Sequence, residues 1–124
     1  MGMKLRRGCG FADASAMMTA MVTVSVFYPK TSDSKFDHEY YLTNHVPLVK
    51  ARWGGMGLEK AMVLRGRSTM DGGTCAWELI GLLTFSSLKE LRAAMAAHGA
   101  EIVGDIPRFT NVQPVIQINE PVAI

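Results

Sequence analysis

The side chains best suited to chemistry are concentrated between Phe36 and Leu48, where tyrosines, histidines and acids follow one another closely. Tyr41, His45 and Leu48 have the spacing that brings side chains onto one face of an α-helix. A neutral imidazole accepts a proton near neutral pH, and a tyrosine hydroxyl can donate a hydrogen bond to a developing oxyanion. We therefore expect His45 to act as a general base and Tyr41 as a hydrogen-bond donor on the same helix face.

Pro47 interrupts the backbone hydrogen bonding of this helix beside His45. Proline lacks an N–H, and its ring disfavours helical geometry at the preceding residue, so we expect a kink or a restart that frees the carbonyl of Thr43. A free acceptor next to an imidazole suits a polar ligand group or an ordered water. The alternative is a simple bend that leaves His45 as a core histidine with a satisfied hydrogen bond, and both interpretations stay open at this point.

The flanking sequence predicts the elements that position this helix. Val22, Val24 and Val26 alternate with their neighbours and predict a strand over 21–28. The helix itself is expected over 36–52, with Asp33 or Ser34 as its N-cap. Turn residues, alternation and a capping-box serine predict the other elements: strands over 58–68, 76–85 and 112–119, and a helix over 87–97 that Gly99 ends.

The order β-α-β-β-α-β is that of the ferredoxin-like α+β fold, a four-stranded antiparallel sheet with both helices on one face. The strand over 76–85 is apolar on both sides, because Trp77, Leu79 and Leu83 alternate with Ile80 and Leu82. A sheet face in contact with solvent should be polar. We therefore expect a second subunit to cover the face without helices, and hence a homodimer.

Composition narrows the classes of function. A chain of 124 residues forms one domain by its size, and no apolar run is long enough to span a membrane. The formal charge is +2, but acidic and basic residues balance from Met21 onward, so we expect no nucleic-acid partner. Cys9 and Cys75 have no metal-ligand spacing and form no disulfide framework, so we expect no metal site and a cytoplasmic setting.

Residues 1–20 differ from the rest of the chain. They are rich in small residues and have no helical or strand periodicity. Gly8, Gly10 and Asp13 interrupt the continuous apolar run that a secretory signal requires. We interpret this segment as a tail outside the fold, and residues 21–124 as the folded domain.

The spacing Phe36-Asp37-x-x-Tyr40-Tyr41-x-x-x-His45-x-Pro47-Leu48 resembles the first-helix signature of the EthD family, within the dimeric α/β-barrel superfamily. The run Asp105-Ile-Pro-x-Phe-Thr-Asn111 is similar to that family's C-terminal pattern. The resemblance covers about residues 22–120 and implies a homodimer whose two sheets pack as a barrel. It also implies a role in small-molecule degradation or in tailoring aromatic polyketides. Superfamily relatives include cofactor-free monooxygenases, isomerases, dehydratases and haem-binding enzymes.

These inferences converge on an EthD-like enzyme that needs no cofactor and acts on a small hydrophobic or aromatic molecule. The chemistry would be of the monooxygenase type or of the dehydratase or isomerase type. The expected catalytic residues are His45, Tyr41 and, from the family signature, Asp37. The expected substrate contacts are Tyr40, Leu48, Trp77 and Phe109. One alternative is a non-catalytic dimeric module that binds a small ligand in a degradation or biosynthesis pathway, and another is haem binding through His45.

The tail interpretation gives a first prediction. Deleting residues 1–20 should leave the melting temperature and the oligomeric mass unchanged, because nothing in that segment predicts a buried face. Thermal melting and sedimentation of the shortened and full-length chains test this. A fall of many degrees in the melting temperature would mean that the segment packs on the domain.

Overall fold

The computed structural model describes residues 20–124, so the predicted tail lies outside the described residues except for Ala20. The strands are β2 (Val22–Pro29), β3 (Leu58–Arg65), β4 (Trp77–Phe85) and β5 (Val115–Asn119). They pair antiparallel in the order β3-β4-β2-β5. The helical segments are α2 (His38–Tyr40), η1 (Tyr41–His45), α3 (Val46–Trp53), α4 (Leu88–Asp105) and η2 (Ile106–Arg108).

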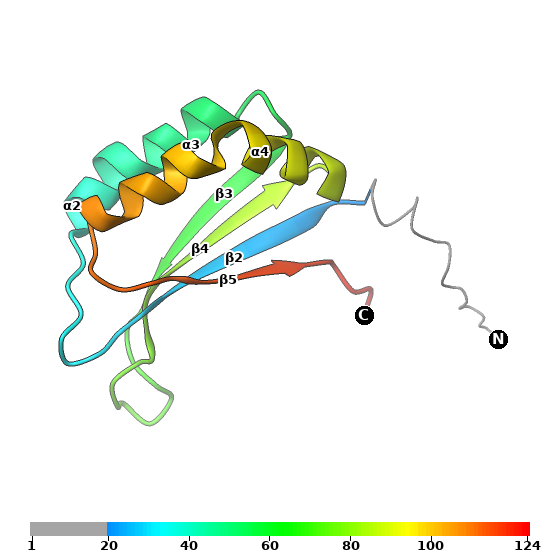
Figure 1. The fold of residues 1–124 in the computed structure, drawn as a ribbon. Coiled ribbons are helices and arrows are strands. Elements are labelled where there is room, and N and C mark those ends of the chain that lie inside the picture. Colours follow the sequence, from blue (N-terminus) through cyan, green and yellow to red (C-terminus); the bar gives the residue numbers. More distant parts are fainter. Residues whose placement is uncertain (1–19) are drawn as a thin grey trace.

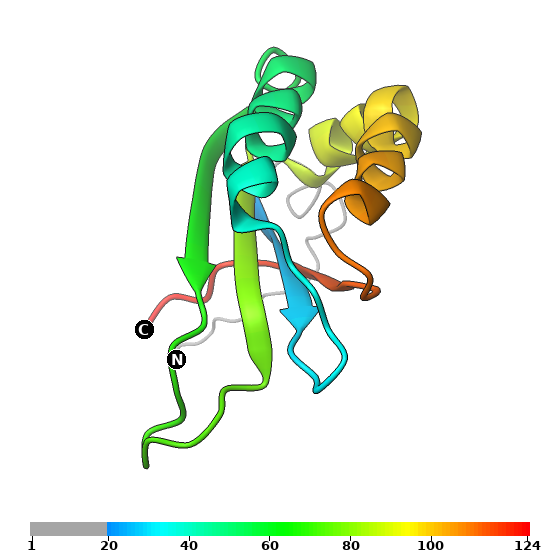
Figure 2. The same cartoon turned by 90° about the vertical axis from the view of Figure 1, so that its left-hand side faces the viewer.

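The helices lie on one face of the sheet and leave the other face open (Figures 1 and 2). This arrangement confirms the predicted ferredoxin-like α+β fold. Alternation along β2 turns Val22, Val24 and Tyr28 towards the helices, where each is at most 7% exposed. Trp53 of α3 and Leu91 of α4 pack against this face in the main hydrophobic core. Of residues 20–124, no helix has the length and apolar character to cross a membrane.

The first helix begins at His38, two residues later than predicted. Its N-cap is Asp37, whose carboxylate accepts a hydrogen bond from the backbone N–H of Tyr40 at 3.0 Å. Neither Asp33 nor Ser34 fills this role, because the chain before Asp37 forms a turn and a bridge to Thr110. The irregularity expected near Pro47 is a π-helical turn over Tyr41–His45, in which the N–H of Val46 bonds the carbonyl of Tyr41. After the helix, Gly57 adopts a φ of +97° and closes the turn into β3.

The prediction that α4 ends near Ala97 is wrong, because the helix continues to Asp105. Its N-terminus is as predicted: Ser87 caps it by accepting from the N–H of Glu90 at 3.1 Å. Gly99 lies inside the helix, buried beneath the side chain of Met95. Ile102, one turn beyond, is only 5% exposed in the core, and this burial offsets the helix-weakening effect of the glycine.

The start of β4 also differs from the prediction. Regular alternation predicts that Trp77 lies on the same side of the sheet as Leu79. The pairing instead shifts register between Tyr28 and Pro29, so that Leu79 is paired with Tyr28 and Trp77 with Pro29. The indole therefore packs against Phe27, with ring centroids 5.2 Å apart. Because Phe27 alternates with the helix-facing residues of β2, this contact lies on the open side of the sheet.

The open face is apolar over much of its area. Met62, Leu64 and Val115 are 40%, 45% and 51% exposed, and Ile80 and Leu82 are half-buried beside them. No element among residues 20–124 covers this face (Figure 2). A homodimer that buries it remains our prediction.

We expect wild-type protein to sediment as a dimer at micromolar concentration, with roughly 1,200–2,000 Å² buried in total. Leu64→Glu should shift it towards the monomer, because an unpaired carboxylate would then be buried in the interface. Leu42→Glu is the matched control, since Leu42 is 54% exposed but lies on the helical side. A monomeric wild-type mass would contradict the prediction.

Candidate functional site

The site is built around a hydrogen bond that joins η1 to α4. Nδ1 of His45, at the end of the π-helical turn, lies 2.9 Å from Oδ2 of Asp105, the last residue of α4. The side chains are 6% and 13% exposed, so the pair is largely shielded from solvent. The extension of α4 beyond Gly99 is what brings this carboxylate to the imidazole.

Two further groups bind the same carboxylate. The hydroxyl of Tyr40 donates to Oδ1 of Asp105 at 2.9 Å, and Nε of Arg108 lies 3.7 Å from that oxygen. Burial alone would raise the pKa of Asp105, but the hydrogen bonds from His45 and Tyr40, with the nearby positive charges, lower it on balance. Asp105 is therefore ionised at neutral pH.

The ionised carboxylate sets the tautomer of His45. A carboxylate only accepts hydrogen bonds, so Nδ1 must carry the proton that is shared with Asp105. In the neutral ring Nε2 then holds a free lone pair. No residue between 20 and 124 forms a recorded hydrogen bond with Nε2, so this nitrogen is available to accept a proton.

Aromatic rings hold the imidazole from two sides. Tyr41 stacks on His45 with centroids 5.5 Å apart, and Phe109 approaches the imidazole with centroids 4.7 Å apart. Phe109 is 3% exposed and belongs to a buried cluster with Tyr28 and Tyr41. The ring has little freedom to rotate away from Asp105.

His45 lines a cavity of about 100 Å³ between the helices and the sheet. Its wall is mostly aliphatic, and residues from both helices and the central strands contribute to it. The side chains that bring a free polar group to it are His45, Tyr41 and Tyr28, since the indole N–H of Trp53 is bonded to the carbonyl of Ala94. Burial raises the pKa of Tyr41 to about 12 and that of Tyr28 still further, so both hydroxyls stay protonated.

The structure brings only some of the predicted site residues to this cavity. His45 and Tyr41 line it, Tyr40 reaches Asp105 instead, and Phe109 packs behind the imidazole. Leu48 packs at the edge of the main core. Asp37 is engaged as the helix cap and Trp77 lies against Phe27, so neither contributes to the cavity wall.

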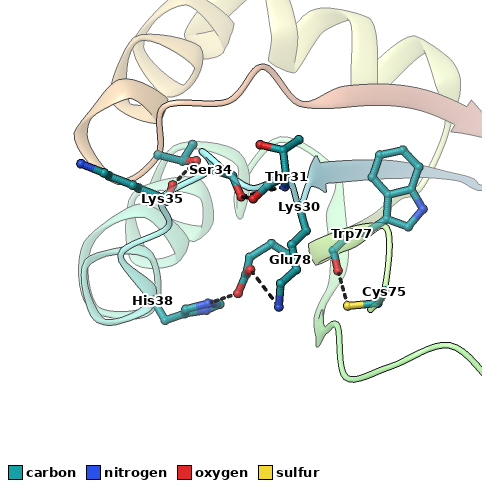
Figure 3. A network of polar contacts seen from close by, with 9 residues as sticks. Lys30, Thr31, Ser34, Lys35, His38, Cys75, Trp77 and Glu78 are labelled. Carbon is teal, nitrogen blue, oxygen red and sulfur yellow. Dashed lines mark hydrogen bonds and ion pairs between the residues drawn. The ribbon is translucent and has the colours of Figure 1, made fainter. Parts of the chain in front are cut away.

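His38 lies on the flank of the first helix, where a histidine is expected to face solvent, but its side chain contacts the sheet instead. Its Nε2 lies 2.6 Å from Oε2 of Glu78, whose other oxygen is 3.8 Å from Nζ of Lys30 (Figure 3). The imidazole is only 21% exposed, because it lies against Glu78 of β4. The contact between His38 and Glu78 links the N-terminus of the helix to the sheet, away from the cavity.

Asp105 and Tyr28 are the site residues that sequence reasoning missed. Asp105 stood in the C-terminal pattern but received no role, because its contact with His45 spans 60 residues. Tyr28 ends a strand pattern in which an inward aromatic side chain is ordinary core. Among residues 20–124 no group of three potential metal ligands is assembled.

Comparison with solved structures decides the family. The chain is similar to an EthD-like protein from Ralstonia eutropha JMP134, with 39% sequence identity and a TM-score of 0.78. The match covers 85% of this chain and 95% of that protein. The chain belongs to the EthD family. No protein-family model matches it, and neither does any curated protein.

More distant structures share the fold. An EthD family protein from Bacillus halodurans C-125 has 20% identity and a TM-score of 0.62, over 82% of this chain and 99% of that one. SnoaB from Streptomyces nogalater, described as a cofactor-independent oxygenase, has 12% identity and a TM-score of 0.57, over 84% and 94%. The EthD fold thus extends to proteins with little sequence in common.

The role of Asp105 predicts a pH-dependent stability difference. Asp105→Asn should lower the free energy of unfolding at pH 7 by about 1–3 kcal/mol, because buried donors lose their carboxylate. The folded pKa of Asp105 is lowered below its ordinary 3.8, so its contribution is complete above pH 3.8 and is lost as pH falls through the folded pKa.

Denaturant melts from pH 7 to pH 2 test this prediction. The wild-type and variant curves should converge only at the acid end. Glu101→Gln is the control, because this exposed carboxylate pairs with Arg52 at the surface and its loss should have much less effect. An equal gap between wild type and Asp105→Asn at all pH values would contradict the assigned role.

Proposed function

We propose that this EthD family protein is an enzyme in which His45 transfers a proton to or from a small, largely apolar substrate bound in the cavity. The observation that supports the proposal is the bond from His45 Nδ1 to the ionised Asp105, which leaves the Nε2 lone pair free in a largely apolar cavity. Asp105 is a positioning residue, since it acts through the imidazole rather than on the substrate.

The proton transfer can be followed atom by atom. Nε2 of His45 takes a proton from a carbon next to a carbonyl, the C–H bond breaks, and its electron pair moves onto the carbonyl oxygen. The hydroxyl of Tyr41 donates a hydrogen bond to that oxygen as its negative charge develops. Asp105 stabilises the imidazolium, which can return the proton to another carbon or to a leaving hydroxyl group.

The apolar wall favours this chemistry in two ways. It excludes water that would compete for the hydroxyl of Tyr41, and it strengthens the electrostatic interactions among the groups within the cavity. The two aromatic neighbours keep the imidazole in one orientation. The resulting carbanion is common to isomerisation, dehydration and reaction with dioxygen, and these are the reaction types that we propose for the protein.

The similar solved structures support the fold and leave the reaction to experiment. One structure of the same fold, SnoaB, bears the description of a cofactor-independent oxygenase, and at 12% identity it supports the fold rather than the reaction. The alternative is a binding module that holds a small ligand in the same cavity without turnover. The two functions differ in whether the chain accelerates a proton transfer.

Hydrogen–deuterium exchange of cyclopentanone in deuterium oxide tests the proposal without knowledge of the natural substrate. Wild-type protein should accelerate loss of the α-proton signals above the buffer rate. His45→Gln should reduce this acceleration by about 10²–10⁴-fold, the range typical of general-base catalysis. Asp105→Asn should alter the pH profile of the exchange rate.

His98→Gln is the matched control, because that histidine lies on α4, 4.0 Å from Glu101, and does not line the cavity. Melting temperatures establish that each variant is folded. Binding of cyclopentanone with no accelerated exchange would favour the non-catalytic module. Equal exchange by wild type and His45→Gln would rule out His45 as the base.

A further inference from the structure

Two buried tyrosine hydroxyls at the cavity have no recorded partner. Tyr28 is 2% exposed and Tyr41 is 5% exposed, and neither hydroxyl forms a hydrogen bond within residues 20–124. Buried tyrosine hydroxyls usually find a partner, so each such exception requires an explanation. Tyr40 is a contrasting case in the same chain, because its hydroxyl donates to Asp105 at 2.9 Å.

The two tyrosine side chains are neighbours in the cavity wall. Their rings meet edge to face with centroids 6.0 Å apart, and both side chains line the cavity with His45. Gly81 of β4 lies beside the hydroxyl of Tyr41, buried in the middle of a strand. A Cβ at this position would stand 3.2 Å from the hydroxyl oxygen of Tyr41. A glycine within a strand often marks the close approach of another group, and here that group is the hydroxyl of Tyr41.

The charges around the cavity restrict what can bind there. Within residues 20–124, no Lys, Arg, Asp or Glu lines it. The nearby cation is Arg108, whose side chain is 72% exposed and lies 3.7 Å from Asp105. With His45 in its neutral form, a buried carboxylate or phosphate would find no opposite charge in this lining and would lie near the carboxylate of Asp105, so an anionic ligand is disfavoured.

We propose that the hydroxyls of Tyr28 and Tyr41 together hold a single oxygen atom of an uncharged ligand, either a carbonyl or a phenol oxygen. This inference rests on the proposed function in using the same cavity, and it adds Tyr28 as a recognition residue and a substrate class. Two donors aimed at one oxygen select an oxygenated molecule over a hydrocarbon of the same size. The rest of the ligand is apolar, to match the aliphatic wall.

The ligand can extend beyond the inner cavity. A second hollow of about 340 Å³ lies beside the segment before β5 and shares Val103, Ile106 and Ile116 with the first. Neither tyrosine lines this second hollow. The oxygen therefore binds in the inner cavity, and an apolar body too large for it continues towards the second hollow.

Fluorine NMR with three probes of similar size tests the inference: 4-fluorophenol, 4-fluorotoluene and 4-fluorobenzoate. Wild-type protein should bind the phenol at least tenfold more tightly than the toluene and should bind the benzoate weakest. Tyr28→Phe and Tyr41→Phe remove only a hydroxyl. Each should weaken phenol binding fivefold to tenfold and leave toluene binding unchanged or stronger. Melting temperatures of both variants check that they are folded.

Three outcomes would overturn the inference. They are equal binding of phenol and toluene to wild type, an unchanged preference in Tyr28→Phe, and tightest binding of the benzoate. None of these contradicts the proposed function, which depends on cyclopentanone exchange and on His45→Gln. Absence of binding by all three probes also overturns the inference, and the exchange experiment then decides on the proposed function separately.

Discussion

The hydrogen bond between His45 and Asp105 is the interaction on which the site depends. A carboxylate at the C-terminus of a helix faces the negative end of the helix dipole and is disfavoured there. Asp105 ends α4 in that position. It is stabilised by donors from outside α4, namely the imidazole of His45, the hydroxyl of Tyr40 and the guanidinium of Arg108. The same interaction therefore orients the imidazole of His45 and joins the first helix to α4.

Few polar groups line the cavity, and they differ in whether they have a hydrogen-bond partner. Nδ1 of His45 is bonded to Asp105, whereas Nε2 and the hydroxyls of Tyr28 and Tyr41 have no partner in the described part of the chain. Burial keeps both tyrosines protonated, so each hydroxyl has a proton to donate to an acceptor. The fold thus presents one imidazole and two phenol hydroxyls in an otherwise mostly aliphatic space.

Much of the fold follows from local patterns in the sequence, but the site does so only in part. Alternation in β2 and the helical spacing of Tyr41 and His45 act over a few residues, so they could be predicted. The continuation of α4 through Gly99 could not, because it depends on burial of Ile102 against residues distant in the chain. For the same reason the partner of His45 was not predicted, since no local pattern links residues 60 positions apart.

The π-helical turn over Tyr41–His45 affects how the chain should be aligned with other proteins. A regular α-helix advances by about 100° for each residue, so the wider turn changes the rotational register between Asp37 and the residues after His45. A relative with a regular helix here would need one residue fewer to present both the cap and the imidazole in the same directions. The number of residues between Asp37 and His45 therefore depends on the backbone geometry of this segment as well as on its residue types. A gap in this segment of an alignment would mark the loss or gain of the wide turn during evolution.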